Sequence, residues 1–282
     1  MSFRVIKGTF HVVGYSPDGD SIRFKADNLD NWALLEGIKV RLNSKQHAQL
    51  RIEAIDTLET HYQNQHQPLL FADAAAKRLF ALLGITNVVW NASHSQVVSA
   101  NDGTEGFIVS RTTEENGRPV SFVFGPSLDV QDGQEIFVNA KLTRKSVNYH
   151  MLKEGLAYPT FYDGLFYDLR ELFAIRTQRA RAKLKGLWTV DATNKFIQIN
   201  GLSDVTDNIV LLPKLFRRLV SYLKTSGGLF NAQQFVAYLK NGNEKVLILN
   251  KLHFTHLDNL IEVDQAGRIR LSELPEDLVF LA

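Results

Sequence analysis

The sequence lacks cysteine, an excess of charge of either sign, and any long apolar run. Without cysteine, the chain can form neither a disulfide framework nor a thiol-based site. It has 32 Lys and Arg against 30 Asp and Glu, whereas proteins that only wrap nucleic-acid phosphates are more basic. Any contact with nucleic acid must therefore come from a local patch.

No stretch of about eighteen apolar residues indicates a membrane span, and no signal peptide is visible. We therefore expect a cytoplasmic protein with no membrane partner, and secretion stays open as the alternative. The chain has 282 residues, of which 45% are hydrophobic. A chain of this size can bury a substantial core, and it is expected to form two structural units rather than one.

Residues 50–60 join an alternating strand to a group of polar residues. Apolar residues recur at every second position from 50 to 54, which predicts extended backbone up to Asp56. Asp56, Thr57 and Glu59 then gather two carboxylates, a hydroxyl and their carbonyls at the strand end. Such an oxygen-rich group suits a hard cation such as calcium. It is also compatible with an ordinary strand end whose acids are solvated.

Arg51 lies five residues before Asp56. In a regular strand this odd spacing would place the two side chains on opposite faces of the sheet. Both can serve one site only if the strand bulges, twists strongly or ends before Asp56. The sequence does not decide between these alternatives.

Two other turns next to strands carry similar residues. Asp-Gly-Asp-Ser at 18–21 precedes an alternating strand, so Asp20 lies at the start of that strand. Asn-Gly-Arg at 116–118 precedes a strand at 120–124 and places Arg118 in a hairpin turn. Taken alone, Arg118 is an exposed turn residue. Only its place in the ordered set favours a function.

In chain order, Asp-Gly-Asp-Ser, then Arg and Ile-Asp-Thr-Leu-Glu-Thr, then Asn-Gly-Arg resemble the staphylococcal nuclease (thermonuclease) family. The phrases Gly-Leu-Ala at 155–157 and Gly-Leu-Trp at 186–188 also resemble that family. The resemblance covers about residues 5–190. It implies an α+β fold, with an OB-type five-stranded β-barrel carrying three helices, in a domain of residues 1–190.

The remaining residues, 191–282, lie outside the resemblance. Residues 211–224 are amphipathic, a second helix is expected near 231–239, and 260–271 contain a hairpin signal. We expect a mostly helical C-terminal domain, either a winged-helix module or a plain helical packing domain. Three basic residues lie off the apolar face of its first helix, namely Lys214, Arg217 and Arg218.

The resemblance implies that calcium is the cofactor. Its ligands would be the carboxylates of Asp20 and Asp56 and the backbone carbonyl of Thr57. A hard cation with oxygen ligands agrees with the residue types present. His61 and His66 lie five residues apart without a clear third ligand, which does not favour zinc.

The resemblance also implies the reaction. It indicates a nuclease, a phosphodiesterase that hydrolyses DNA and RNA without regard to the sugar, by attack of water at phosphorus, and leaves 3′-phosphates. Glu59 would hold the attacking water, either as a general base or as a positioning group. Arg51 and Arg118 would clamp the phosphate oxygens, because a planar guanidinium matches their geometry.

Two positions depart from the family pattern. Leu58 stands where the family usually has Pro, and Asn116 stands where an aromatic residue often stacks on a base. We expect these changes to alter affinity and substrate preference more than chemistry. The alternative is a non-catalytic nucleic-acid-binding or interaction module on the same barrel, although such a module would not be expected to retain all the acids and arginines. The oligomeric state and the choice between DNA and RNA stay open.

Overall fold

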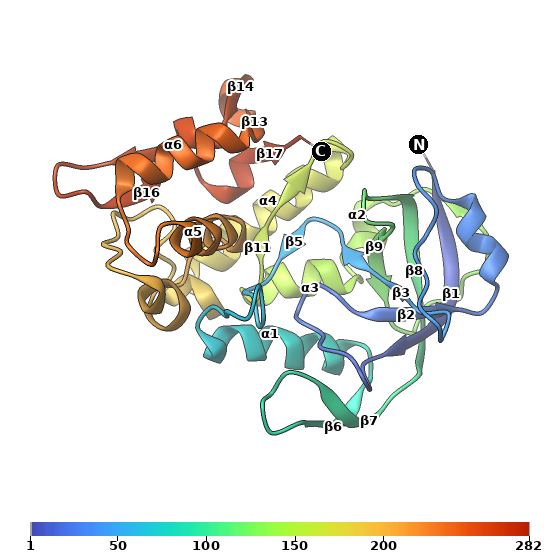
Figure 1. Cartoon of the computed structure of the whole chain (residues 1–282). Coiled ribbons are helices and arrows are strands. Elements are labelled where there is room, and N and C mark those ends of the chain that lie inside the picture. The colour runs from blue at the N-terminus through green and yellow to red at the C-terminus, as the bar shows by residue number, and fades with distance from the viewer. Residues whose placement is uncertain (1, 282) are drawn as a thin grey trace. The chain divides into compact units, whose positions relative to one another are not determined.

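The computed structural model describes residues 2–281 (Figure 1). Its contacts divide the chain into two compact units. The first unit comprises Met1–Glu53 and Ala75–Met151, and the second comprises Ala54–Ala74 and Leu152–Ala282. Two helices, α1 (Leu69–Leu82) and α3 (Val147–Glu154), contain residues of both units. The predicted boundary between residues 190 and 191 lies inside the second unit.

A nearly closed, barrel-like sheet forms the first unit. Its six strands lie in the order β3-β2-β1-β8-β9-β4, and β10 also pairs with β1. The end strands β3 and β4 are separated in the chain by one residue, Leu50, so the sheet nearly closes on itself. The strands are β1 (Phe3–His11), β2 (Arg23–Ala26), β3 (Ala48–Gln49), β4 (Arg51–Ile52), β8 (Thr104–Thr113), β9 (Pro119–Phe124) and β10 (Glu135–Ile136).

Aromatic side chains fill the interior of this sheet. The rings of Phe10 and Phe24 lie 5.0 Å apart, and those of Phe107 and Phe124 are stacked at 4.8 Å. Gly106 makes this packing possible, since a Cβ there would lie 2.5 Å from the ring of Phe10. The remaining elements of the unit are a 3₁₀ helix (Leu29–Leu34), the hairpin of β6 (Thr86–Trp90) and β7 (Val97–Asn101), and the short helix α2 (Ala140–Thr143).

The second unit contains both helices and strands. Its helices are α4 (Tyr167–Ala182), α5 (Pro213–Thr225) and α6 (Ala232–Gly242), with a π-helical turn at Asp204–Asn208 and 3₁₀ turns at Gly186–Thr189, Leu249–Lys251, Leu257–Leu260 and Pro275–Asp277. Its strands are β5 (Ile55–Asp56), β11 (Tyr158–Pro159), β12 (Phe161–Tyr162), β13 (Lys245–Ile248), β14 (His253–His256), β15 (Ile261–Val263), β16 (Ile269–Leu271) and β17 (Leu278–Phe280).

The prediction of a mostly helical C-terminal region is wrong. Its strands β17, β13 and β14 lie side by side in a four-stranded sheet with β12. The predicted hairpin is confirmed as β15 and β16, with Gly267 at a φ of +74° in its turn. Short strands of this kind carry little periodicity, because two to four residues are too few to show a clear alternation.

The core of the second unit is organised around α5. Leu215, Phe216, Leu219 and Leu223 of this helix are buried, and they share one cluster with residues from distant parts of the chain. That cluster includes Leu58 from residues 54–74, Tyr158 and Trp188 from the middle of the chain, and Phe280 near its end. Three stretches of sequence therefore build a single core. Within residues 2–281, no helix has the length and apolar character needed to cross a membrane.

Candidate functional site

The strand expected to run up to Asp56 is interrupted. Strand β4 ends at Ile52, and β5 begins at Ile55. Between them Ala54 adopts a left-handed conformation with a φ of +68°, which breaks the alternation of side chains. The expectation of unbroken extended backbone is therefore wrong, and so the opposite-face objection to Arg51 and Asp56 no longer applies.

Backbone partners explain why the strand breaks there. The Glu53 amide donates to the Ser121 carbonyl at 2.9 Å, within the first unit. The Ala54 carbonyl accepts from the Thr160 amide at 3.1 Å, within the second. Neighbouring residues thus bond to different segments of the chain, and the turn lets both keep their hydrogen bonds.

Asp20, Arg51 and Arg118 belong to the first unit. The carbonyl of Asp20 accepts from the amide of Ile52 at 3.1 Å, which fixes the Asp-Gly-Asp-Ser turn beside β4. Arg51 lies in β4 opposite Val120 of β9, in a parallel pair, and Arg118 immediately precedes β9. Arg51 therefore lies in one strand and Arg118 just before its neighbour, close in register, which the sequence by itself did not show.

The predicted hairpin turn before β9 is present, with Gly117 at a φ of +76°. The side chain of Arg118 folds back on Glu114, and its Nε and Nη2 donate to the two carboxylate oxygens at 3.1 and 3.2 Å. Burial opposes the charge on Glu114, but hydrogen bonds from Arg118 and Asn116 outweigh it and lower the pKa of this carboxyl. Arg118 thus has a local partner within its own turn.

Asp56, Thr57 and Glu59 belong to the second unit. Asp56 closes β5, opposite Tyr158 in the antiparallel pair with β11, and its side chain is 3% exposed. Thr57 is also buried, and the side chain of Glu59 is 15% exposed. A buried carboxylate must be paired or hydrogen bonded, because leaving water costs an isolated charge many kcal/mol.

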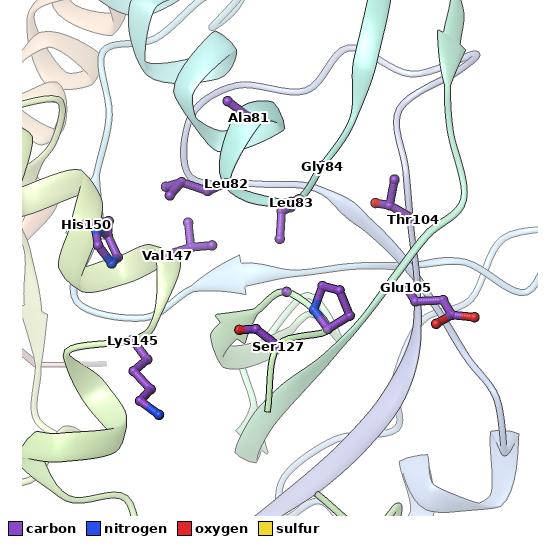
Figure 2. A pocket seen from close by; sticks show the side chains of 12 residues that line it. Ala81, Leu82, Leu83, Gly84, Thr104, Glu105, Ser127, Lys145, Val147 and His150 are labelled. Carbon is purple, nitrogen blue, oxygen red and sulfur yellow. The ribbon is translucent and has the colours of Figure 1, made fainter. Parts of the chain in front are cut away.

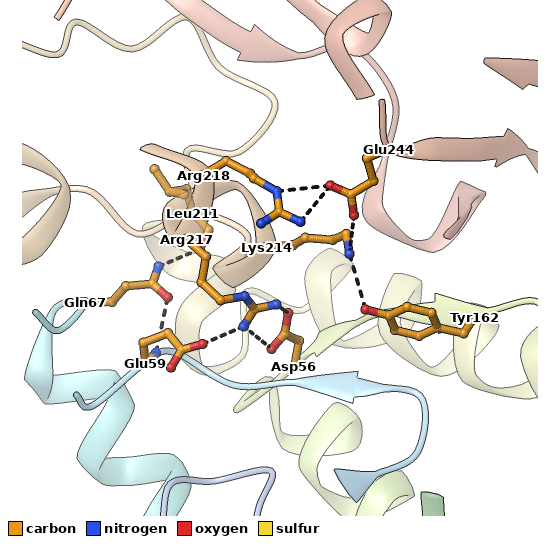
Figure 3. Close-up of polar contacts among 9 residues, drawn as sticks. All are labelled: Asp56, Glu59, Gln67, Tyr162, Leu211, Lys214, Arg217, Arg218 and Glu244. Carbon is orange, nitrogen blue, oxygen red and sulfur yellow. Dashed lines mark hydrogen bonds and ion pairs between the residues drawn. The ribbon is translucent and has the colours of Figure 1, made fainter. Parts of the chain in front are cut away.

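Arg217 of α5 supplies a cation to both acids (Figure 3). Its Nη1 and Nη2 donate to the two oxygens of Asp56 at 3.0 and 2.7 Å, and Nη1 also donates to Glu59. Burial opposes the charge on Arg217, but the two carboxylates outweigh it and raise the pKa of the guanidinium well above its usual range. We call these three side chains the acidic centre.

The basic residues of α5 follow the spacing of a helix face. Arg217 and Arg218 lie three and four positions after Lys214, so all three emerge on one side of the helix. Lys214 and Arg218 both pair with Glu244, which lies between α6 and β13 (Figure 3). Burial opposes the charge on Glu244, but these two cations outweigh it and lower the pKa of its carboxyl. Their ion pairs hold the helix in the register that presents Arg217 to Asp56.

Gln67 positions the backbone of Glu59. Its side-chain Oε1 accepts from the backbone N–H of Glu59 at 3.2 Å, and its backbone N–H donates to the backbone carbonyl of Glu59 at 2.8 Å. Its Nε2 donates to the Leu211 carbonyl, just before α5, at 2.8 Å. Gln67 is fully buried. This side chain therefore ties the loop that carries Glu59 to the chain that leads into α5.

Sequence reasoning missed both Arg217 and Gln67 as site residues. For Arg217 a signal existed, because a basic residue next to an apolar helix face needs either solvent or a partner. Nothing in the sequence named that partner, which lies 161 residues away. For Gln67 the sequence offers no signal.

As the carboxylates are placed here, they do not fit calcium. Calcium takes six to eight oxygen ligands, whereas both oxygens of Asp56 and one of Glu59 bind guanidinium nitrogens. Within residues 2–281, no group of three or more His, Asp or Glu side chains is arranged to hold a metal ion. The calcium expectation stays a prediction.

A cavity of about 590 Å³ lies in the first unit, where α1 ends and α3 begins (Figure 2). Leu82, Leu83 and Val147 give it an apolar side, and Glu105 and Lys145 add one charge of each sign. None of the six candidate residues, all within the described part of the chain, lines this cavity. Its mixed lining selects no ligand class, so it is not assigned to the site.

Comparison with models of known protein families and with curated proteins finds no match to this chain.

Proposed function

We propose that this chain is a nuclease, a hydrolase that cleaves phosphodiester bonds in DNA and RNA. The observation that carries the proposal is that Asp56 and Glu59 lie close enough together to bind the same guanidinium in the acidic centre. Two neighbouring carboxylates, one buried and one partly buried, can hold a cation and orient a water, and phosphodiester cleavage requires both. The motif order in the sequence supports the same conclusion.

The barrel-like sheet gives further support. Its two end strands β3 and β4 are consecutive in the chain, as expected for a small closed barrel of the OB type. Arg51 and Arg118 adjoin neighbouring strands of this sheet. In the proposed function they contact phosphate oxygens, which guanidinium groups bind in a bidentate manner.

Glu59 is the proposed residue for water. Its backbone is fixed by both hydrogen bonds to Gln67 despite Leu58 in place of a proline, and its carboxylate is held by Arg217. A fixed carboxylate can accept a proton from water or orient it toward phosphorus, and either role lowers the barrier. The products expected from the resemblance are 3′-phosphates.

The test is cleavage of end-labelled single-stranded DNA, duplex DNA and RNA by the purified protein, with calcium or with chelator. Asp56→Asn and Glu59→Gln should each reduce cleavage at least a hundredfold, the scale of losing a group that acts in the transition state. Asp163→Asn and Glu171→Gln are matched controls, because both acids are exposed in the same unit. Equal activity of Asp56→Asn and the controls would refute the assignment.

A second candidate function is a nucleic-acid-binding module without catalysis. The observation that favours it is Arg217 itself, since a guanidinium bound to Asp56 and Glu59 leaves them paired rather than open to a metal. Binding of labelled oligonucleotides without cleavage, under every metal condition and in every variant, would favour this alternative.

A further inference from the structure

We infer that Arg217 is a built-in cation that excludes a divalent metal ion from the carboxylates of Asp56 and Glu59, so that metal binding requires its displacement. The inference deepens the proposed function and rests on it only for the consequence for cleavage. Metal binding itself is measured separately. The inference concerns residues of the second unit alone.

The geometry makes the two cations mutually exclusive. Arg217 binds Asp56 through two nitrogens, at 3.0 and 2.7 Å, and so uses both oxygens of that carboxylate. It reaches Glu59 through one of the same nitrogens. A calcium ion at its usual distance of about 2.3–2.6 Å from these oxygens would overlap the guanidinium.

Charge adds to this steric conflict. The side chain of Asp56 is 3% exposed and that of Arg217 is 20% exposed, so water screens their charges poorly. A divalent ion placed beside a guanidinium in such surroundings would be strongly repelled. The acids therefore hold one of the two cations at a time.

The rest of the unit keeps Arg217 in position. Lys214 and Arg218, on either side of it in α5, are anchored on Glu244. The apolar face of the same helix is buried in the core of the unit. Displacement of Arg217 thus requires either a new rotamer of its side chain or movement of α5.

The experiment is a calcium titration by calorimetry of the wild-type chain, Arg217→Gln and Arg179→Gln, each at full length. Arg179→Gln is the matched control, because it removes an exposed arginine of α4 in the same unit and leaves the ion pairs of α5 intact. We expect Arg217→Gln to bind one calcium ion at least tenfold more tightly than the wild type. Arg179→Gln should match the wild type.

Arg217→Lys serves as the second variant, should Arg217→Gln fail to fold. Lysine is a point charge and lacks the planar fork that uses both oxygens of Asp56, so calcium affinity should rise at least threefold over the wild type. Equal affinity of the wild type and the folded Arg217 variant, or binding by neither, would overturn the inference.

The titration also separates this inference from the proposed function. If Arg217→Gln gains calcium binding but no variant cleaves nucleic acid, the inference stands and the nuclease assignment fails. If the wild type cleaves nucleic acid and Arg217→Gln binds calcium no better than the wild type, the assignment stands and the inference fails.

Discussion

The two units of this protein satisfy their charged groups in different ways. In the first unit, Arg118 pairs with Glu114, four residues before it in the same hairpin turn. In the second unit, Arg217 pairs with Asp56, 161 residues before it in the chain, and with Glu59. The first pair forms wherever its turn forms, whereas the second exists only when distant segments have packed together.

This difference follows from how each unit is built. The sheet of the first unit contains three strands of six to ten residues, β1, β8 and β9, and β8 pairs with β9 across the turn at Gly117. The second unit gathers residues 54–74 and 152–281 around α5, and each of its named strands contains only two to four residues. Its stability therefore depends on tertiary packing, and so does the placement of its acids.

The largest expected effect comes from deleting residues 191–282. This truncation removes α5 and β17, and with them Phe216 and Phe280 from the core that also contains Leu58 and Tyr158. We expect the second unit to lose its folded structure, with low soluble yield and loss of amide protection in β5. Hydrogen exchange measures both units at once, and protection of β5 equal to that in the full chain would contradict this prediction.

The next effect compares the two arginine pairs. Arg217→Gln should reduce the free energy of unfolding by about 3–5 kcal/mol, because it leaves the buried carboxylate of Asp56 and the partly buried carboxylate of Glu59 without this cation. Arg118→Gln should cost less than about 1 kcal/mol, since its pair is local and the Arg118 side chain is 31% exposed. Urea unfolding measures both.

A control isolates the charge effect. In the triple variant Asp56→Asn, Glu59→Gln, Arg217→Gln, all three charges are removed together, so most of the lost stability should return. Similar losses for Arg217→Gln and Arg118→Gln would show that the two units do not differ in this respect.

A smaller effect is expected in the first unit on acidification. His47 stacks on His11 at 4.1 Å, and burial, together with the charges of His11, Lys45 and Lys25, lowers the pKa of its ring to about 4. In the unfolded chain the His47 ring is protonated below about pH 6.5. The contribution of the neutral ring to the free energy of unfolding is therefore complete above that pH. It is lost as pH falls toward 4.

We expect this loss to be about 1–2 kcal/mol, less than the full pKa change would give, because solvent screens part of the ring. The measurement is the free energy of unfolding from pH 8 to pH 4, for the wild type and for His47→Gln. The variant should lose less stability across this window. Parallel profiles would contradict the prediction.

The smallest effect is expected from removing an asparagine N-cap, which begins one helix in each unit. Asn231 caps α6 by accepting from the Gln234 amide at 3.0 Å, and Asn139 caps α2 by accepting from the Leu142 amide at 3.0 Å. Asn231→Ala should cost about 1 kcal/mol. Asn139→Ala should cost less, because α2 has only four residues. Urea midpoints test the difference, and an equal cost would contradict it.

Much of the first unit could be predicted from sequence. The strand after the hairpin turn at Gly117 is present as β9, and the turn itself has the left-handed glycine that the motif requires. This strand is a short run rich in valine and phenylalanine that follows a turn signal, and one stretch of sequence carries both features alone. The break at Ala54 could not be predicted, because alanine rarely adopts a left-handed conformation and partners distant in the chain impose it here.

The sequence alone determined which residues are candidates for chemistry, namely the acids and arginines next to strand ends. It also determined the amphipathic face of α5, since the period of a helix is local. Only the tertiary structure decided which cation the acids receive. Pairing Arg217 with Asp56 and Glu59 depends on the register of α5, which Glu244 and the shared core fix from positions far away in the chain. Long-range pairing leaves no periodic trace in sequence, because each partner alone is only a charged residue.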